Sequence, residues 1–188
     1  MQFEYHKGSM TKETFDLIQE LLPHGSTILE MGSGYGTKIL SEYYTMYSIE
    51  HNPKWINSHD SNYIYCPVVQ QTNPVYQRQD LPNNIPGNIL QFNEWYDIDT
   101  ILDQLPKKYD MLFIDGPNSD YRRTNFISHI DKFNTNAVWL FDDVNREFDR
   151  RTYEKVCEIR NKKINSEEAY VVDCTSPNTA TKWVGVIK

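Results

Sequence analysis

Apolar residues recur with two different periods along the chain, and the change from one period to the other predicts its secondary structure. The stretch TKETFDLIQELLP has helical spacing and stops at Pro23, which predicts an amphipathic helix over residues 11–22. Short apolar runs without that spacing predict strands. In the first half these are STILEM (26–31), YTMYSIEH (44–51) and NYIYCPVV (62–69), with a helical run, TKILSEYY (37–44), between the first two.

The second half repeats the alternation and ends differently. Predicted strands are YDMLFID (109–115) and NAVWLFDD (136–143), and predicted helices cover 97–105, 121–133 and 145–163. The last two extended runs, 169–174 and 181–188, are joined by a turn-rich loop too short for a helix, which indicates an antiparallel hairpin. Helices between apolar strands indicate a parallel sheet covered on both faces. We therefore expect an α/β, Rossmann-like, doubly wound, seven-stranded and mostly parallel sheet with a C-terminal antiparallel hairpin.

One segment interrupts this order. Residues 70–92 hold three prolines and a glycine among polar residues and predict a long loop. Loops of about 20 residues in compact domains are usually functional or disordered, so this one is a candidate substrate lid. The chain has no internal repeat and no low-complexity linker, and we expect one domain over residues 1–188.

Composition narrows the possible partners. The 188 residues are 39% apolar and 24% charged, as in folded proteins, and a net charge of −7 disfavours a nucleic-acid partner. No apolar run approaches the ~18 to 20 residues that cross a membrane, and the N-terminal stretch MQFEYHKGSM does not read as a signal peptide. The three cysteines are scattered and form no CxxC pair, which indicates reduced packing residues. We expect a cytoplasmic protein with a small-molecule substrate, and the oligomeric state stays open.

Ligands of such sheets bind at the carboxyl ends of the strands, so the residues that end the predicted strands are the candidate site. These residues are Glu30 and Met31 with Gly32, Gly34 and Gly36; Glu50 and His51; Asp115, Gly116 and Pro117; and Asp142 with Asp143. Glycines after a strand let the backbone approach a ligand closely. Glu50, 18 residues after Gly32, is placed to accept the hydroxyls of a ribose.

Two nucleoside cofactors compete for this arrangement. A dinucleotide fingerprint needs G-x-G-x-x-G, but the spacing here is G-x-G-x-G, with Thr37 where the third glycine should be. The carboxylate of Glu30 would repel a pyrophosphate and would suit an amino-acid ammonium group. The pattern favours a nucleoside that carries an amino acid, while an ordinary tight turn remains the alternative.

The acidic residue followed by GxGxG resembles motif I of the class I S-adenosylmethionine-dependent methyltransferases, and YSIEHN resembles their ribose-binding strand end. This resemblance implies that Glu30 faces the methionine ammonium and that Glu50 holds the ribose. It also implies that the backbone of the glycine loop lines the methionine and the ribose. The implied cofactor residues are Glu30, Gly32, Ser33, Gly34, Gly36, Glu50, His51 and Asp115.

The methyl acceptor depends on the next two strand ends. Asp115, Asp142 and Asp143 should lie together, and three carboxylates repel each other unless a cation neutralises them; Mg²⁺ or another divalent cation is one candidate. The stretches DGPNSDY and LFDDVNR resemble metal-dependent O-methyltransferases of the catechol and macrocin types. The lysine base of the catechol type is missing, and Asn118 stands in that region. Asp115 is therefore the candidate general base and, without a metal, Asp143 is the second.

A further resemblance points to carbohydrates. DGP, a following arginine and DDVNREFD are similar to the glucuronoxylan 4-O-methyltransferases, although Asp149 replaces their glutamate. The implied activity is methyl transfer to a hydroxyl of a sugar or uronic acid. Arg122, Arg123 and Arg146 lie just beyond these strand ends and are candidates to bind an anionic group of the substrate.

Other interpretations stay open. The chain could methylate a nucleic-acid base or a protein side chain, although DGPN stands where base methyltransferases have an Asn/Asp-Pro-Pro-Tyr motif. It could also be a non-catalytic cofactor-binding module with a structural acid cluster. Asp143 could simply cap the following helix. Trp95 and Tyr96 could cover an adenine or fill the core.

Overall fold

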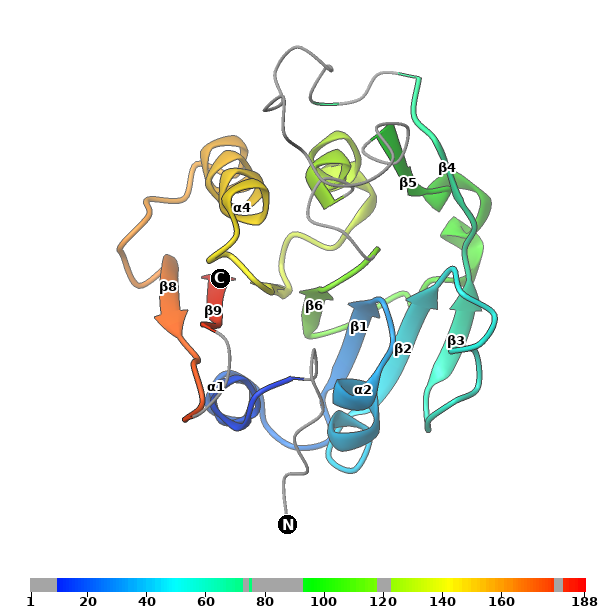
Figure 1. Cartoon of the computed structure of the whole chain (residues 1–188), viewed down its shortest axis with the longest axis horizontal. Coiled ribbons are helices and arrows are strands. Elements are labelled where there is room, and N and C mark those ends of the chain that lie inside the picture. Colours follow the sequence, from blue (N-terminus) through cyan, green and yellow to red (C-terminus); the bar gives the residue numbers. More distant parts are fainter. Residues whose placement is uncertain (1–9, 73–74, 76–92, 118–122, 178–180) are drawn as a thin grey trace.

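Seven strands form the central sheet of the computed structural model, which describes residues 10–72, 75, 93–117, 123–177 and 181–188. Their order is β3-β2-β1-β6-β7-β9-β8 (Figure 1). The strands are β1 (Thr27–Met31), β2 (Thr45–Glu50), β3 (Asn62–Tyr65), β6 (Met111–Ile114), β7 (Val138–Phe141), β8 (Ala169–Asp173) and β9 (Trp183–Ile187). The first five in spatial order pair in parallel, and β9 runs antiparallel to both β7 and β8. The predicted fold class, including the terminal hairpin, is confirmed.

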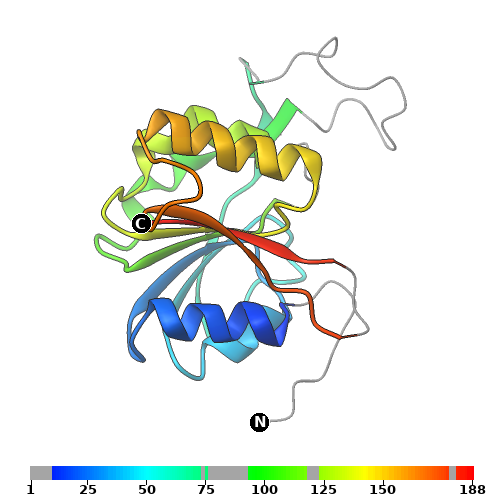
Figure 2. The same ribbon diagram turned by 90° about the vertical axis from the view of Figure 1, so that its left-hand side faces the viewer.

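Helices cover both faces of this sheet. Figure 2 shows α1 (Lys12–Leu21) and α2 (Tyr35–Leu40) on one face, with α4 (Glu147–Ile159) and the 3₁₀ helix η5 (Thr124–Lys132) on the other. The helix predicted over 11–22 is confirmed, and Thr11 caps it by accepting a hydrogen bond from the backbone N–H of Thr14 at 3.1 Å. No helix in the described part of the chain is long and apolar enough to cross a membrane.

Side chains alternate between the two faces along each strand, and both faces are buried. Ile28 packs in the cluster that contains α1, whereas its neighbour Leu29 packs in the cluster that contains α4 and η5. The same holds for Met111 and Leu112 on β6. Burial on both sides explains why the strands read as nearly continuous apolar runs.

The extended run predicted over 62–69 is not one strand. It is divided between β3 in the main sheet and β4 (Val68–Gln70), which pairs antiparallel with β5 (Glu94–Tyr96) in a separate two-stranded sheet. Pro67 lies at the division, and a proline has no backbone N–H to continue a ladder. Most of the loop predicted over 70–92, namely 73–74 and 76–92, lies outside the described residues, so its role as a lid stays a prediction.

The predicted helices lie where the sequence pattern placed them, but their ends and helix types differ from the prediction. The helix expected over 37–44 runs from Tyr35 to Leu40, and that over 145–163 runs from Glu147 to Ile159. The segment 97–105 forms two short 3₁₀ turns, η3 (Ile98–Thr100) and η4 (Leu102–Gln104). Helix ends fray into 3₁₀ geometry, and apolar spacing alone does not separate the two helix types.

Candidate cofactor and acceptor site

A cavity of about 450 Å³ opens at the carboxyl ends of β1, β2 and β6. It is lined by most of the residues that the sequence singled out: Glu30, Gly32, Ser33, Gly34, Gly36, Glu50, His51, Asp115, Arg123, Asp143 and Arg146. Asp142 is 3% exposed and does not line the cavity, and Arg122 lies outside the described residues. Parallel strands bring their carboxyl ends to one edge of the sheet, which is why residues far apart in sequence meet here.

The glycine loop is shaped by two different needs. Gly32 has φ +87°, and a Cβ there would lie 3.3 Å from the backbone of Gly116. Protein geometry therefore requires glycine at this position. A Cβ on Gly34 would meet no atom within 4 Å, although Gly34 lines the cavity. Gly34 is the N-cap of α2, where glycine is one of several suitable residues, and a ligand lying against the backbone would be a further reason for it.

Glu50 is fixed by backbone donors. Its Oε1 accepts hydrogen bonds from the N–H groups of His51 and Asn52 at 2.7 and 2.6 Å, and its Oε2 accepts one from Ser33 at 2.9 Å. Burial alone would raise the pKa of Glu50, but these bonds and the His51 side chain outweigh it and lower the pKa. The group is a preorganised carboxylate, and Oε2 keeps a lone pair for a ligand hydroxyl.

Glu30 is a carboxyl group of opposite character. It is 3% exposed, and its Oε1 accepts hydrogen bonds from the hydroxyls of Thr37 at 2.6 Å and Ser48 at 2.5 Å. Burial raises its pKa to about 8, since desolvation outweighs these two bonds. Thr37, which breaks the dinucleotide fingerprint, thus holds the acid that ends β1.

Tyr96 is a cavity residue whose place the sequence left open. It is 0% exposed, and among the described residues its hydroxyl has no hydrogen-bond partner. A Cβ on Gly116 would lie 2.5 Å from that hydroxyl, so it sits directly over the turn after β6. Trp95, next to it, packs in the core against Phe126, with ring centroids 6.2 Å apart. Trp95 therefore belongs to the core, and Tyr96 lines the cavity.

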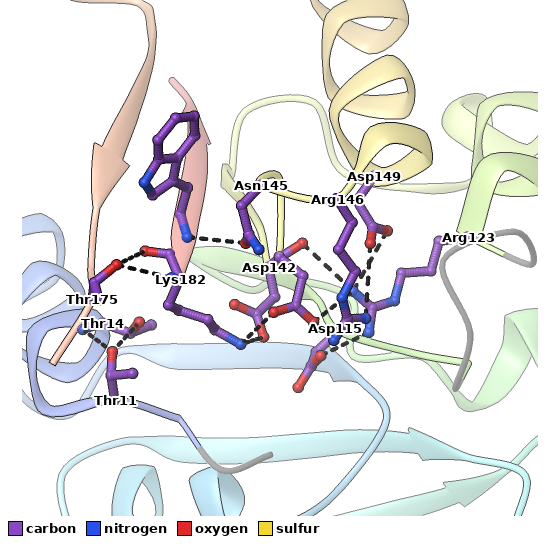
Figure 3. A network of polar contacts seen from close by, with 12 residues as sticks. Thr11, Thr14, Asp115, Arg123, Asp142, Asn145, Arg146, Asp149, Thr175 and Lys182 are labelled. Carbon is purple, nitrogen blue, oxygen red and sulfur yellow. Dashed lines mark hydrogen bonds and ion pairs between the residues drawn. The ribbon is translucent and has the colours of Figure 1, made fainter. Parts of the chain in front are cut away.

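The predicted acid cluster forms, and it is neutralised by side chains. Carboxylate oxygens of Asp115, Asp142 and Asp143 lie within 4.8 Å of one another. Figure 3 shows Asp142 and Asp115 between Lys182 at one end and Arg123 at the other. The ion pairs are Arg123–Asp115 at 3.0 Å, Arg123–Asp149 at 3.5 Å, Arg123–Asp143 at 3.6 Å, Arg146–Asp143 at 2.9 Å, Arg146–Asp149 at 4.0 Å, Lys182–Asp143 at 2.8 Å and a close contact between Lys182 and Asp142.

These contacts set the charge of each group. Burial alone would raise the pKa of Asp143, but Lys182 and Arg123 lower it. Burial would also lower the pKa of Lys182, yet the surrounding aspartates raise it, so Lys182 is an ammonium. The three carboxylates are close enough for a divalent cation, but Lys182 already lies between two of them and Arg123 pairs the third. As arranged, the residues do not fit a bound divalent cation, which would have to displace Lys182.

Sequence reasoning missed Lys182, Asp149 as an ion-pair partner of Arg123, and the cavity position of Tyr96. One signal was present for Lys182. Because β9 is antiparallel to β7, the residue before β9 must lie beside the carboxyl end of β7, where Asp142 and Asp143 stand. No signal was present for Tyr96, whose place depends on the pairing of two three-residue strands.

Solved structures with a similar fold cover nearly the whole chain. Precorrin-6y C5,15-methyltransferase from Geobacter metallireducens matches with a TM-score of 0.57 and 14% identity over 100% of this chain and 94% of its own. Precorrin 8W decarboxylase from Methanobacterium thermoautotrophicum gives 0.55 and 12% over 95% and 90%. Aeropyrum pernix fibrillarin, solved with natively bound S-adenosylmethionine, gives 0.53 and 12% over 88% and 67%.

Sequence comparisons found less. A scan against protein-family models gave no matching model, and a search of curated proteins gave no match. Identities of 14% or less show a common fold and not a common activity. The chain has the Rossmann-like fold that these solved structures share, and they include one methyltransferase and one protein with bound S-adenosylmethionine.

Proposed function

We propose that this chain is an S-adenosylmethionine-dependent O-methyltransferase that acts on a hydroxyl of a small substrate, a sugar. One observation carries the proposal. The cavity at the carboxyl ends of β1, β2 and β6 joins a glycine loop to Glu50, whose carboxylate is held by three backbone N–H groups. The shared fold, including that of fibrillarin with bound S-adenosylmethionine, supports the same assignment.

The cavity residues fit this cofactor, which supplies an electrophilic methyl group on a sulfonium when bound. Glu50 would accept a ribose hydroxyl, Glu30 would face the ammonium, and the open space over Gly34 would take the ligand against the backbone. Apart from Glu30, three acidic side chains, Glu50, Asp115 and Asp143, line the cavity with two cationic ones, Arg123 and Arg146, which suits a cationic ligand and opposes the pyrophosphate of a dinucleotide.

The acceptor hydroxyl would be deprotonated by Asp115. This side chain lines the cavity, is 44% exposed and is oriented by Arg123 at 3.0 Å. Asp143 is the weaker candidate base, because Lys182, Arg146 and Arg123 surround it and lower its pKa. Asp143 would instead orient the acceptor.

Neutral sugars fit the cavity better than uronic acids. Arg123 and Arg146, which were candidates to bind an anion, are both paired with aspartates. An anionic acceptor would have to compete with carboxylates that are already in place.

A cytoplasmic location remains our proposal, and the three free, buried cysteines Cys66, Cys157 and Cys174 support a reducing compartment.

The test is transfer of a labelled methyl group from S-adenosylmethionine to a panel of neutral sugars, uronic acids, nucleosides, RNA and unfolded protein. We expect label on neutral sugars and a loss of about 10²-fold or more in kcat for Asp115→Asn. The exposed Asp103→Asn serves as the matched control. Label on RNA or protein would reassign the acceptor, and cofactor binding without transfer to any acceptor would indicate a binding module.

A further inference from the structure

Lys182 reaches the acid cluster from a distant part of the chain and lies between Asp142 and Asp143. Its Nζ lies 2.8 Å from Asp143 Oδ1 and also contacts Asp142 Oδ2 (Figure 3). The Lys182 side chain is 12% exposed, and those of the two aspartates are 3% and 10% exposed. A lysine that is buried to this extent between two buried carboxylates differs from a surface ion pair, which contributes little.

The backbone fixes Lys182 at this place. Its N–H donates to Thr175 Oγ1 at 2.9 Å, and its carbonyl accepts from the N–H of Cys174 at 2.8 Å. The next residue, Trp183, donates its N–H to Asn145 Oδ1 at 3.2 Å and accepts from the N–H of Val144 at 3.0 Å. The start of β9 is therefore tied to the turn that carries Asp142 and Asp143, and the ammonium has a built position.

The charges of the cluster favour a cation at this place. Burial raises the pKa of Asp142 to about 7, and Lys182 opposes that shift. Without Lys182, the carboxylates of Asp142 and Asp143 would face each other in a buried environment, with Asp115 within 4.8 Å. Buried charges of like sign are costly unless a cation compensates them. Arg123 and Arg146 compensate Asp115, Asp149 and one oxygen of Asp143, and neither forms an ion pair with the Asp142 carboxylate among the described residues.

We propose that Lys182 is the resident cation of this site: its ammonium takes the position of a divalent ion between Asp142 and Asp143 and holds Asp143 at the cavity. The chain then needs no metal, and removal of the ammonium creates a divalent-cation site. Lys182 is a positioning residue in this account, because it contacts Asp143 and does not itself line the cavity. The part of the proposal that concerns activity rests on the proposed methyltransferase function.

A titration with Mn²⁺, in which the electron paramagnetic resonance signal reports the free ion, tests the proposed role of Lys182 directly. We expect no stoichiometric binding to the wild type, to Lys182→Arg or to the surface control Lys155→Ala, and one ion bound by Lys182→Ala. Lys182→Gln, which keeps the volume and offers an oxygen ligand, should bind as well if the alanine variant does not fold. One ion bound by the wild type and lost in Asp142→Asn would overturn the proposal, and so would folded lysine variants that bind none.

Methyl transfer provides the second readout. We expect wild-type activity to be equal in EDTA and in Mg²⁺, and the activity of Lys182→Ala to be low in EDTA and raised several-fold by Mg²⁺ or Mn²⁺. Wild-type activity that EDTA abolishes and Mg²⁺ restores would contradict the proposal. The Mn²⁺ titration needs neither cofactor nor acceptor, so a protein without methyltransferase activity would refute the proposed function and leave the result on Lys182 intact.

Discussion

Glu30 and Glu50 lie at the carboxyl ends of the neighbouring strands β1 and β2, and their surroundings give them different protonation at neutral pH. Glu50 receives three backbone N–H groups, and its pKa is lowered. Glu30 receives two hydroxyl groups in a fully desolvated place, and its pKa is raised to about 8. Stronger desolvation of Glu30 and the backbone donors at Glu50 together make Glu50 the fixed negative charge of the site.

The raised pKa of Glu30 makes stability depend on pH. The folded pKa of about 8 lies above the unfolded value of 4.5, so between these values the folded state holds a proton that the unfolded chain has lost. Wild-type stability should therefore fall as pH rises from about 5 to 8, by up to ~1.4 kcal/mol per pH unit. Glu30→Gln keeps an acceptor for Thr37 and Ser48 and does not titrate. Thermal unfolding at pH 5 and 8 should show its advantage over the wild type growing with pH, and a constant difference would contradict this assignment.

Tyr96 gives a prediction in which stability and binding respond differently. Its buried hydroxyl has no partner among the described residues, so Tyr96→Phe removes an unsatisfied group and should leave the melting temperature equal or higher. If the hydroxyl serves a ligand in the cavity, affinity for S-adenosylmethionine or kcat should fall several-fold. Calorimetric titration and thermal unfolding of the same sample measure both. A variant that is less stable and binds normally would show that the hydroxyl is structural.

At the scale of elements, the parts predicted from sequence are those fixed by local periodicity and by parallel topology. Glu30, Glu50 and Asp115 could be placed together because each ends a strand of one parallel sheet. The β4–β5 pair could not be predicted, since strands of three residues carry too little pattern. Lys182 could have been predicted from the antiparallel direction of β9, because that direction places the residue before β9 beside the carboxyl end of β7.

Two glycines should behave oppositely when a methyl group is added. A Cβ on Gly185 in β9 would lie 2.6 Å from the ring of Tyr153 in α4, so Gly185→Ala should lose about 1–3 kcal/mol of stability. Gly34→Ala meets no protein atom and should fold with nearly wild-type stability. Its added Cβ would enter the ligand space, so cofactor affinity should fall at least tenfold. Denaturant unfolding with a parallel binding titration checks both, and normal cofactor binding by folded Gly34→Ala would remove the argument from this glycine.

For the molecule as a whole, the charge distribution and the fold point to one class of ligand. The net charge of −7 and the carboxyl groups around the cavity oppose polyanions and favour a cationic nucleoside. The site combines residues at the carboxyl ends of β1, β2, β6 and β7, which are far apart in the sequence. It therefore exists only in the folded chain. Ligand binding should therefore stabilise the fold by mass action.

Isothermal titration of the wild type with S-adenosylmethionine, and separately with NAD, tests the central claim most directly. Glu50→Gln and the exposed control Glu20→Gln complete the set. We predict one S-adenosylmethionine bound per chain, clear preference over NAD, a loss of about tenfold or more in Glu50→Gln, and unchanged affinity in Glu20→Gln. Preference for NAD, or no binding of S-adenosylmethionine by the folded wild type, would contradict the account.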